Sequence, residues 1–369
     1  MSVKQYPFYI KSTVILFGLI LVCYALYNLR GVFAPIAFSL IMAMLLNPLT
    51  NKLEQKGMKK FFAVTVTLVI ALLLVGGLFY FISAQIMSFT DNLPALKIKF
   101  NQHLAEIHHW VAVNFNISVS KQEKMVTDAL SNSRTLVGSA LGGVLSTVGF
   151  FVLVPVYIFL FLFYKKLFLG FFHEVFSEEN TGKVNQVLNE TKKAIQSYMV
   201  GLLLEALVVA VLNAIALLIL GVDYAILLAI ICALVNMLPY IGGIVATLLP
   251  MLIASVTKDG LSVQVGIIVA NAIIQFTDNH FLIPLLVSSR VKINAFFSIV
   301  IVLLGGALWG VAGMFLSIPF VAILKIIFDR VPEMKPWGKL LGDEVPTRRR
   351  IGKQRKKKES VAEKIVDET

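Results

Sequence analysis

The sequence has little charge and almost no cysteine. Only 15% of the residues are charged, against roughly 25% in an ordinary soluble domain, while 58% are hydrophobic. The apolar residues stand in long continuous runs, which excludes intrinsic disorder and also an outer-membrane barrel, whose strands alternate. Cys23 and Cys232 each lie inside an apolar run without a CxxC or Cys/His spacing, so they indicate neither a disulfide framework nor a zinc site. A protein with several membrane-spanning helices is what remains.

Catalytic motifs are also missing. The sequence contains no G-x-x-x-x-G-K-[ST] loop for ATP phosphates, no HExxH, no pair of intramembrane aspartates and no G-x-S-G. Because no nucleophile and base are arranged together, we expect no enzyme, no cofactor and no metal site. The remaining roles are movement of a solute across the membrane and a structural function within it.

Six apolar blocks are long enough to cross a bilayer, which takes roughly 20 residues per helix. They are residues 12–29, 32–49, 61–85, 136–164, 198–220 and 262–279. Two further blocks, 224–256 and 296–328, are too long for one span and too short for two. Each is interrupted near its centre, by NMLPYIGG or by GGALWGVAG, where proline and glycine disfavour continuous helix. The predicted fold is an all-α polytopic membrane protein with six full spans and two Gly/Pro-broken helical hairpins, or with eight spans.

The interruptions mark the expected hairpin tips or hinges. These fall at Pro239, Gly242, Gly243, Gly305, Gly306, Gly310 and Gly313. Gly306 and Gly310 also form a G-x-x-x-G pair, whose commoner use is close packing of helices. Pro239 and Gly242 are harder to explain by packing alone, because they stand at the midpoint of an overlong block.

Basic residues predict the orientation. The chain has 33 Lys and Arg against 21 Asp and Glu, for a net charge of +12, and most of the basic residues share one face if the N-terminus is cytoplasmic. This asymmetry predicts that both termini are cytoplasmic. Residues 329–369 are predicted to be a basic disordered tail, and its run TRRRIGKQRKKK is expected to contact anionic lipid and no nucleic acid.

The remaining boundaries define the predicted domains. Residues 1–85 hold the first three spans, 86–134 form a polar helical insertion on the outer face, and 135–328 form the transport core. In the insertion, His103, His108, His109 and Glu106 suggest a metal site only weakly, since adjacent histidines point to different helix faces. In the cytoplasmic linker 165–196, the run FLGFFHEVF could lie along the membrane interface.

Ionisable and amide side chains inside predicted spans are costly and therefore candidates for function. The candidates for a proton, cation or substrate pathway are Glu205, Asn213, Asn271, Gln275 and Asp278. The alternative for the amides is that they stabilise helix contacts. Asp278 could also pair with Arg290 or Lys292 at the end of its span. Glu205 lies deep in its span and is expected to serve a proton or cation.

The hairpins strengthen that interpretation through their order in the chain. Each follows a span that carries one of the carboxylates, and the two hairpins begin on opposite faces. Secondary transporters build central binding sites from broken helices arranged in this inverted manner. The free N–H and C=O groups at broken helix ends can hold an anionic group or a cation.

Three runs in the second half of the sequence resemble the AI-2E family of bacterial permeases. They are NMLPYIGGIVATLLPMLIA at 236–254, QFTDNHFLIPLLVSSRVKINAFF at 275–297 and GGALWGVAGMFLSIPFVAILKII at 305–327. The resemblance implies a secondary transporter of the bacterial cytoplasmic membrane and a homo-oligomer. Some members of the family export autoinducer-2, and others act as sodium or lithium/proton antiporters. By position the resemblance adds Tyr240 to the expected tip residues and Asn279 to the pathway candidates. It also implies roles for Pro239, Gly242, Asp278, Pro284, Gly305, Gly306, Gly310, Gly313 and Pro319.

The first hypothesis is therefore a secondary transporter that moves a small polar solute outward, with H⁺ or Na⁺ as the coupling ion. The second is a Na⁺(Li⁺)/H⁺ antiporter. The third is a non-transporting membrane scaffold whose outer insertion and basic tail recruit partners. An apolar, sealed interface between the Glu205 helix and the hairpin tips would favour the scaffold.

Overall fold

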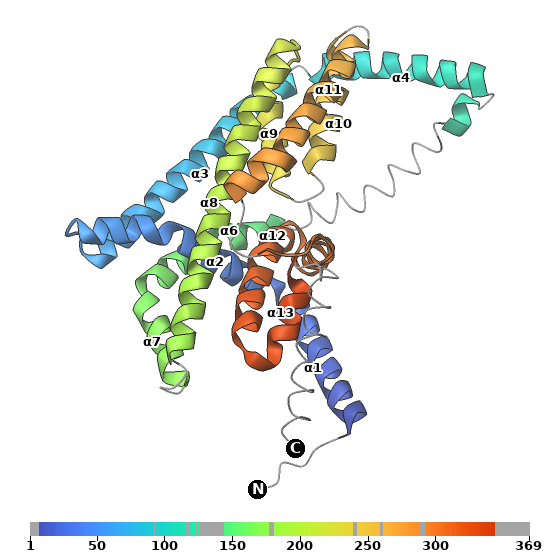
Figure 1. Ribbon diagram of the computed structural model, residues 1–369. Coiled ribbons are helices and arrows are strands. Elements are labelled where there is room, and N and C mark those ends of the chain that lie inside the picture. The colour runs from blue at the N-terminus through green and yellow to red at the C-terminus, as the bar shows by residue number, and fades with distance from the viewer. Residues whose placement is uncertain are drawn as a thin grey trace, which may run out of the picture.

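A computed structural model describes most of the chain, and every labelled element in this part is a helix (Figure 1). The described residues are 7–91, 93–115, 118–122, 124, 144–176, 181–238, 242–258, 261–287 and 292–343. The helices are α1 (Phe8–Asn28), α2 (Arg30–Gln55), α3 (Lys60–Asp91), α4 (Leu93–Phe115), α6 (Val144–Phe163), α7 (Lys165–Val175), α8 (Thr181–Ile219), α9 (Ala225–Asn236), α10 (Gly242–Thr257), α11 (Ser262–Thr277), the π-helix η2 (Asp278–Val287), α12 (Ala295–Arg330), the 3₁₀ turn η3 (Pro332–Met334) and α13 (Lys335–Leu341).

The long helices have the length, composition and exposure of a membrane protein. Within the described residues, four helices are long and apolar enough to cross a bilayer, and a fifth crossing results if α6 and α7, which are bent by 64° to one another, form one span. Large apolar side chains on α3 stay exposed, with Leu74 at 71% and Tyr80 at 78%. Exposure on this scale fits lipid contact and not water. The chain is thus a multi-pass helical membrane protein. The arms of the predicted hairpins are too short for length alone to fix the number of crossings.

Helix α8 runs through the middle of the molecule and contacts both halves of it (Figure 1). On one side, α2, α3 and α6 share an apolar core that includes Ala43, Val64 and Ile158. On the other side, α8 packs with α9, α10 and α11 around Leu217 and Ile267. In Figure 1, α4 projects at one end of the molecule, which we call the α4 end, and α7 and α13 lie at the other, which we call the α7/α13 end.

The first predicted hairpin consists of α9 and α10, which pack against each other. Residues near the start of α9 and the end of α10 share one core, as Leu228 and Ala254 do. Farther along, the Cys232 thiol lies 3.8 Å from the Ala246 carbonyl oxygen. Contacts between progressively closer residues define an antiparallel pair, in which α9 ends at Asn236 and α10 begins at Gly242. Pro239 and Tyr240, two of the expected tip residues, lie outside the described residues.

The second predicted hairpin is formed within α12, whose backbone leaves the helical conformation at Trp309 and Gly310. Gly310 has φ +61°, a conformation that glycine adopts readily and other residues rarely. The two arms then meet at Gly305 and Gly313, where a Cβ on Gly313 would lie 2.0 Å from the Gly305 carbonyl oxygen. The Ser317 hydroxyl donates to the Ile301 carbonyl oxygen across the arms at 3.1 Å. Close approach of the arms is thus the role of these two glycines.

We therefore expect Gly313→Ala to destabilise the second hairpin. The methyl group has no room between the arms, and overpacking of this kind costs about 1–3 kcal/mol. The purified variant should melt several degrees below the parent protein. Gly149→Ala is the control, because a Cβ at Gly149 in α6 would meet nothing within 4 Å. Equal melting temperatures for the two variants would contradict the proposed packing.

Several boundaries differ from those expected. Helix α3 continues to Asp91, into the predicted insertion. Helix α8 begins at Thr181, inside the predicted linker, because Ala194 and the apolar face before the span pack against Ala322 and Ile326 of α12. The helix after residue 262 does not end at 279 but continues as η2 to Val287.

The start of the tail that is predicted to be disordered, residue 329, also differs, because helical structure continues past it. Helix α12 extends to Arg330, and α13 folds back beside it, with the Leu341 carbonyl oxygen accepting from the backbone N–H of Asn294 at 2.8 Å. Buried Gly338 permits this return, since a Cβ there would lie 2.2 Å from an Asp329 carboxylate oxygen. The basic run 347–358 lies outside the described residues, as do the side chains of His103 and Glu106.

Candidate functional site

Glu205 is positioned by the buried face of α8. Gly201, Glu205, Val209 and Asn213 follow one another at four-residue spacing, and all are buried. This spacing places them on one face of the helix. The Glu205 side chain, with 4% exposure, therefore points into the bundle and away from lipid.

Asn236 is positioned by the tip of the first hairpin. It is the last residue of α9, directly before the turn into α10. At Gly242, a Cβ would lie 2.3 Å from the Asn236 Cα atom, so glycine allows the chain to return next to Asn236. The hairpin thus delivers one amide side chain to the end of its first arm.

Asp278 is positioned by a change of helix type. Helix α11 ends at Thr277, and Asp278 begins the wider π-helix η2. Turns of π-helix are rare and occur frequently at functional sites. η2 packs against α8 so closely that a Cβ on Gly201 would lie 2.0 Å from the Leu286 carbonyl oxygen. This contact is one helical turn from Glu205 and brings Asp278, which is 2% exposed, to the same part of the bundle.

The side chains of Glu205, Gln275 and Asp278 meet at the side-chain amide of Asn236. We call these four residues the carboxyl pair site. The Asn236 Nδ2 donates to Asp278 Oδ2 at 2.9 Å and to Glu205 Oε1 at 3.3 Å. The Asn236 Oδ1 accepts from Gln275 Nε2 at 3.1 Å. Two carboxyl groups from different helices therefore share one donor.

A second polar layer lies beside this site on α10 and α11. The Asn271 amide donates to the Gly243 carbonyl oxygen at 3.3 Å and to the Thr247 hydroxyl. The Thr247 hydroxyl in turn donates to the Gly243 carbonyl oxygen at 2.9 Å. Gly243 also faces Gln275, since a Cβ there would lie 3.1 Å from the Gln275 side chain. The polar stripe of α11 is thus joined to the first hairpin by direct contacts.

The electrostatics of the carboxyl pair site are unusual. Among the described residues, Asp278 Oδ1 and Asn271 Oδ1 are buried and have no hydrogen-bond partner. The ion pairs of lysine and arginine in the described part of the chain involve Asp223, Asp329 and Glu190, not Glu205 or Asp278. Two adjacent buried carboxylates repel each other strongly in a medium of low dielectric constant. The arrangement therefore favours binding of a proton or a cation.

The predicted residues divide into three groups. The site unites Glu205, Gln275 and Asp278, and Asn271 stands in the adjoining layer. Asn213 instead donates to the Val209 carbonyl oxygen of its own helix at 2.9 Å, and Asn279 is exposed. The glycines at 305, 306, 310 and 313 belong to the second hairpin. Its tip residue Trp309 shares an apolar cluster with Met199 of α8, about 9 Å along the helix from Glu205 at 1.5 Å per residue.

Sequence reasoning missed Asn236 and Thr247. Asn236 begins the run NMLPYIGG, so its place directly before a predicted tip was the available signal. Thr247 carried no comparable signal, because threonine is common in helices, where its hydroxyl usually bonds a carbonyl oxygen of the same helix.

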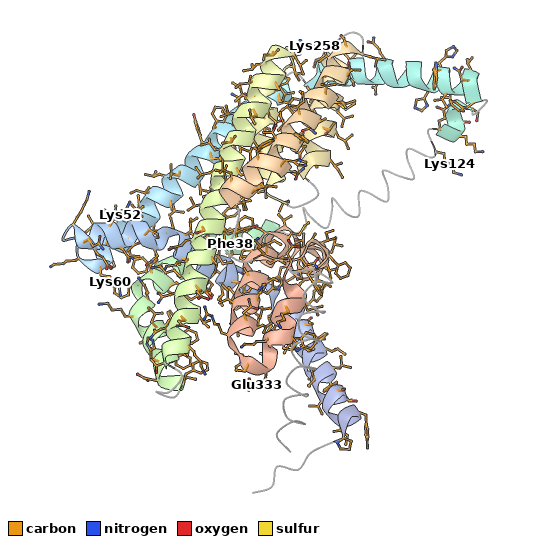
Figure 2. All side chains as sticks on the ribbon, in the orientation of Figure 1. Phe38, Lys52, Lys60, Lys124, Lys258 and Glu333 are labelled. Carbon is orange, nitrogen blue, oxygen red and sulfur yellow. The ribbon has the colours of Figure 1, made fainter. Side chains whose placement is uncertain are left out.

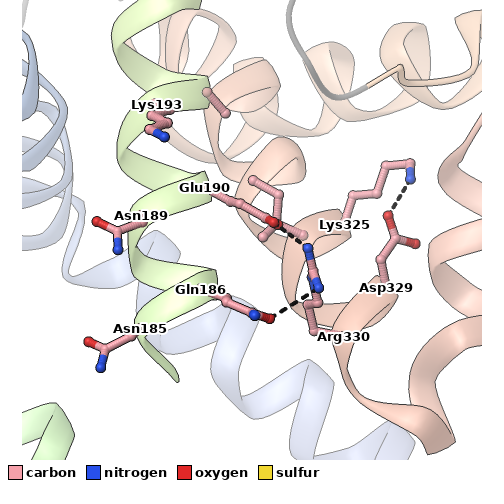
Figure 3. A pocket seen from close by; sticks show the side chains of 10 residues that line it. Asn185, Gln186, Asn189, Glu190, Lys193, Lys325, Asp329 and Arg330 are labelled. Carbon is pink, nitrogen blue, oxygen red and sulfur yellow. Dashed lines mark hydrogen bonds and ion pairs between the residues drawn. The ribbon is translucent and has the colours of Figure 1, made fainter. Parts of the chain in front are cut away.

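A cavity of about 700 Å³ lies at the α7/α13 end, between the first half of α8 and the end of α12 (Figure 3). Arg330 reaches across it and donates to Gln186 at 3.2 Å and to the Glu190 carboxylate. Lys325 pairs with Asp329 at 2.6 Å on the α12 side. Glu190 and Glu205 are separated by about 22 Å along α8 at 1.5 Å per residue, so the cavity and the carboxyl pair site are distinct.

Comparison with known proteins gives a consistent result. The sequence model described as AI-2E family transporter matches residues 14–333. The chain is 23% identical over 317 residues to "Putative transport protein YrrI" of Bacillus subtilis, a match that covers 83% of this chain and 88% of that protein. It is 26% identical over 317 residues to "Putative permease PerM" of Escherichia coli, covering 84% and 90%. The relatives are matched along most of their length.

Proposed function

The chain belongs to the AI-2E transporter family, and from this premise we propose that it is a secondary transporter that moves a small polar solute outward across the bacterial cytoplasmic membrane. Glu205 and Asp278 exchange the coupling H⁺ or Na⁺. The observation that carries the proposal is the shared Asn236 donor, which holds two buried carboxyl groups together without a described lysine or arginine partner.

The positions of the hairpins support this mechanism. Both tips approach the same stretch of α8, the first through Asn236 at Glu205 and the second through Trp309 near Met199. Short broken helices can shift as units, and in transporters such elements gate a central site. The interface between Glu205 and the first tip is polar, whereas a scaffold role would have favoured an apolar, sealed interface.

For orientation, we propose that the α7/α13 end is cytoplasmic. In Figure 2, Lys52 and Lys60 lie on the same side as α7, and an excess of basic residues is typical of the cytoplasmic side. Glu333 lies close to α13, and Lys258 marks the α4 end. Helix α1 starts at the α7/α13 end and α13 lies there too (Figure 1), which fits two termini on one face. The hairpins are proposed to be re-entrant, and the protein to be a homo-oligomer.

Reconstituted vesicles with a trapped pH-sensitive dye test the function. The purified full-length protein is given an outward gradient of a polar metabolite extract, or separately a gradient of Na⁺ or Li⁺. A pH change with the extract alone supports proton-coupled solute export. A pH change with Na⁺ or Li⁺ alone supports the antiporter hypothesis. No response to either gradient would contradict proton coupling through this site.

Asn236→Leu is expected to weaken both folding and transport. The change removes the donor shared by two buried carboxyl groups, and each buried polar group left without a partner costs about 1–3 kcal/mol. The matched control is Asn213→Leu, because Asn213 is buried on α8 but donates only to its own helix. Melting temperature and vesicle transport should both fall further for Asn236→Leu. Equal losses for the two variants would show that Asn236 has no special role.

A further inference from the structure

Helix α7 has two different faces and is bent away from the span before it. The angle between α6 and α7 is 64°, and α7 buries none of its residues. Leu167, Phe168, Phe171, Phe172 and Val175 fall on one side at helical spacing, with exposures from 39% to 66%. Lys166 and His173 lie on the opposite side, and Lys165 and Glu174 stand at the two borders of the apolar side. A short helix of this composition is suited to lie in the membrane interface with its apolar face in the acyl chains.

Four lysines gather where α7 begins. Lys165 of α7 interacts electrostatically with Lys192 on α8, with Lys60 at the start of α3 and with its neighbour Lys166. Glu54 is the one carboxylate among the charged groups that act on Lys165. The Lys60 ammonium also stands 5.3 Å from the centre of the Phe163 ring. The cluster therefore joins three segments that are far apart in the sequence.

Lys165 is held in place, and three of the four lysines are partly removed from water. The Lys165 ammonium donates to Asn47 Oδ1 at 2.8 Å and to Asn51 Oδ1 at 3.3 Å on α2. An ammonium group has three N–H donors, so one remains for a further acceptor. Lys60, Lys165 and Lys192 are all half-buried.

Like charges that are half-buried and close together repel one another, and an anion placed among them offsets that repulsion. Elsewhere in the described chain, Lys258 and Lys325 each have a carboxylate within 3.1 Å. At the start of α7, the charged groups that act on Lys165 are three lysines and one carboxylate, Glu54. An additional anion bound here would offset the excess of positive charge.

We propose that the lysine cluster at the bend between α6 and α7 is a binding site for an anionic phospholipid. The headgroup phosphate lies among Lys60, Lys165, Lys166 and Lys192, and the acyl chains cover the apolar face of α7. A lipid is favoured over a soluble anion because the exposed phenylalanines stand directly beside the lysines on the same short helix. The site is separate from the basic run 347–358, and it is independent of the proposed coupling at Glu205 and Asp278.

Such a lipid would bridge α2, α7 and α8. Lys165 already ties α7 to α2, and Lys192 stands on α8, the helix that carries Glu205. The bound phosphate would hold these helices together at the α7/α13 end. Binding is therefore expected to raise the melting temperature of the protein.

Native mass spectrometry of the full-length protein in neutral detergent tests the proposal by titration with phosphatidylglycerol and, separately, phosphatidylcholine. The parent protein should retain the anionic lipid preferentially. Lys165→Gln with Lys192→Gln should lower that affinity on the order of 30-fold. The charge-retaining pair Lys165→Arg with Lys192→Arg should keep it. The control pair Lys335→Gln with Lys339→Gln, which removes the same charge from exposed positions on α13, should keep it as well.

Several results would overturn the site. One is equal retention of the two lipids by the parent protein. Another is equal loss of binding in the glutamine and arginine pairs, which would show that charge is not the determinant. An equal loss in the α13 control would indicate unspecific charge attraction. Complete displacement of the lipid by inorganic phosphate would identify the ligand as a free anion.

Discussion

Glu205→Gln and Asp278→Asn are each expected to insert and assemble normally and to lose at least about 99% of solute transport in reconstituted vesicles. Each substitution keeps the shape and polarity of the side chain but removes the charge that attracts a proton or cation. A coupled carrier that cannot bind its coupling ion cannot complete its cycle, although it can still fold. Efflux of polar metabolites, measured by mass spectrometry, gives the readout.

The matched control for these variants is Asp223→Asn. Asp223 pairs with Lys258 on the surface at 3.1 Å, between α8 and α9, and lies outside the carboxyl pair site. Its replacement removes the same charge, and an exposed pair contributes only about 0–1 kcal/mol. Transport by Asp223→Asn should equal that of the parent protein. Full transport by both Glu205→Gln and Asp278→Asn would remove the carboxyl pair from the mechanism.

Gly201→Ala is expected to separate α8 from η2 and to reduce stability and transport together. The added methyl group would lie 2.0 Å from the Leu286 carbonyl oxygen, and backbone cannot yield as the end of a flexible side chain can. Overpacking costs about 1–3 kcal/mol, and here it would also pull Asp278 away from Glu205. The melting temperature should fall by several degrees, and transport should fall by a larger factor than the loss of folded protein explains.

Gly76→Ala provides the comparison for that variant. Gly76 lies in α3, and a Cβ there would meet nothing within 4 Å. Alanine favours helix over glycine by roughly 0.5–1 kcal/mol, so this variant should be as stable as the parent protein or slightly more stable. If Gly201→Ala melts at the same temperature as Gly76→Ala, the close packing of α8 and η2 is wrong.

Much of the architecture could be predicted from the sequence. Continuous apolar runs predicted the long helices, because a lipid-facing helix must be apolar over most of its length. The two overlong blocks, 224–256 and 296–328, fold as hairpins, since proline and glycine at their centres disfavour straight helix. The deep carboxylate Glu205 and the polar stripe on α11 could be found in the same way, because polar groups within apolar blocks are conspicuous.

Other features depend on contacts between distant segments and could not be predicted. Asn236 becomes central only when the first hairpin returns beside α8, which no local pattern encodes. The helix that begins with the α-to-π transition at Asp278 packs against Gly201, while Asn279, next in sequence, turns outward. Asn213 shares a helix face with Glu205, but within the described residues it donates only to its own helix. Which polar residues meet is thus decided by the tertiary structure.

Proton movement in vesicles that contain either the parent protein or the double variant Glu205→Gln with Asp278→Asn tests the central claim most directly. Both preparations carry a trapped pH-sensitive dye and receive, in turn, a jump in Na⁺ and a jump in polar metabolite extract. The parent protein is predicted to change the internal pH in response to at least one of these, and the double variant to neither. Equal pH changes in the two preparations, or none in the parent protein with either jump, would contradict proton coupling through Glu205 and Asp278.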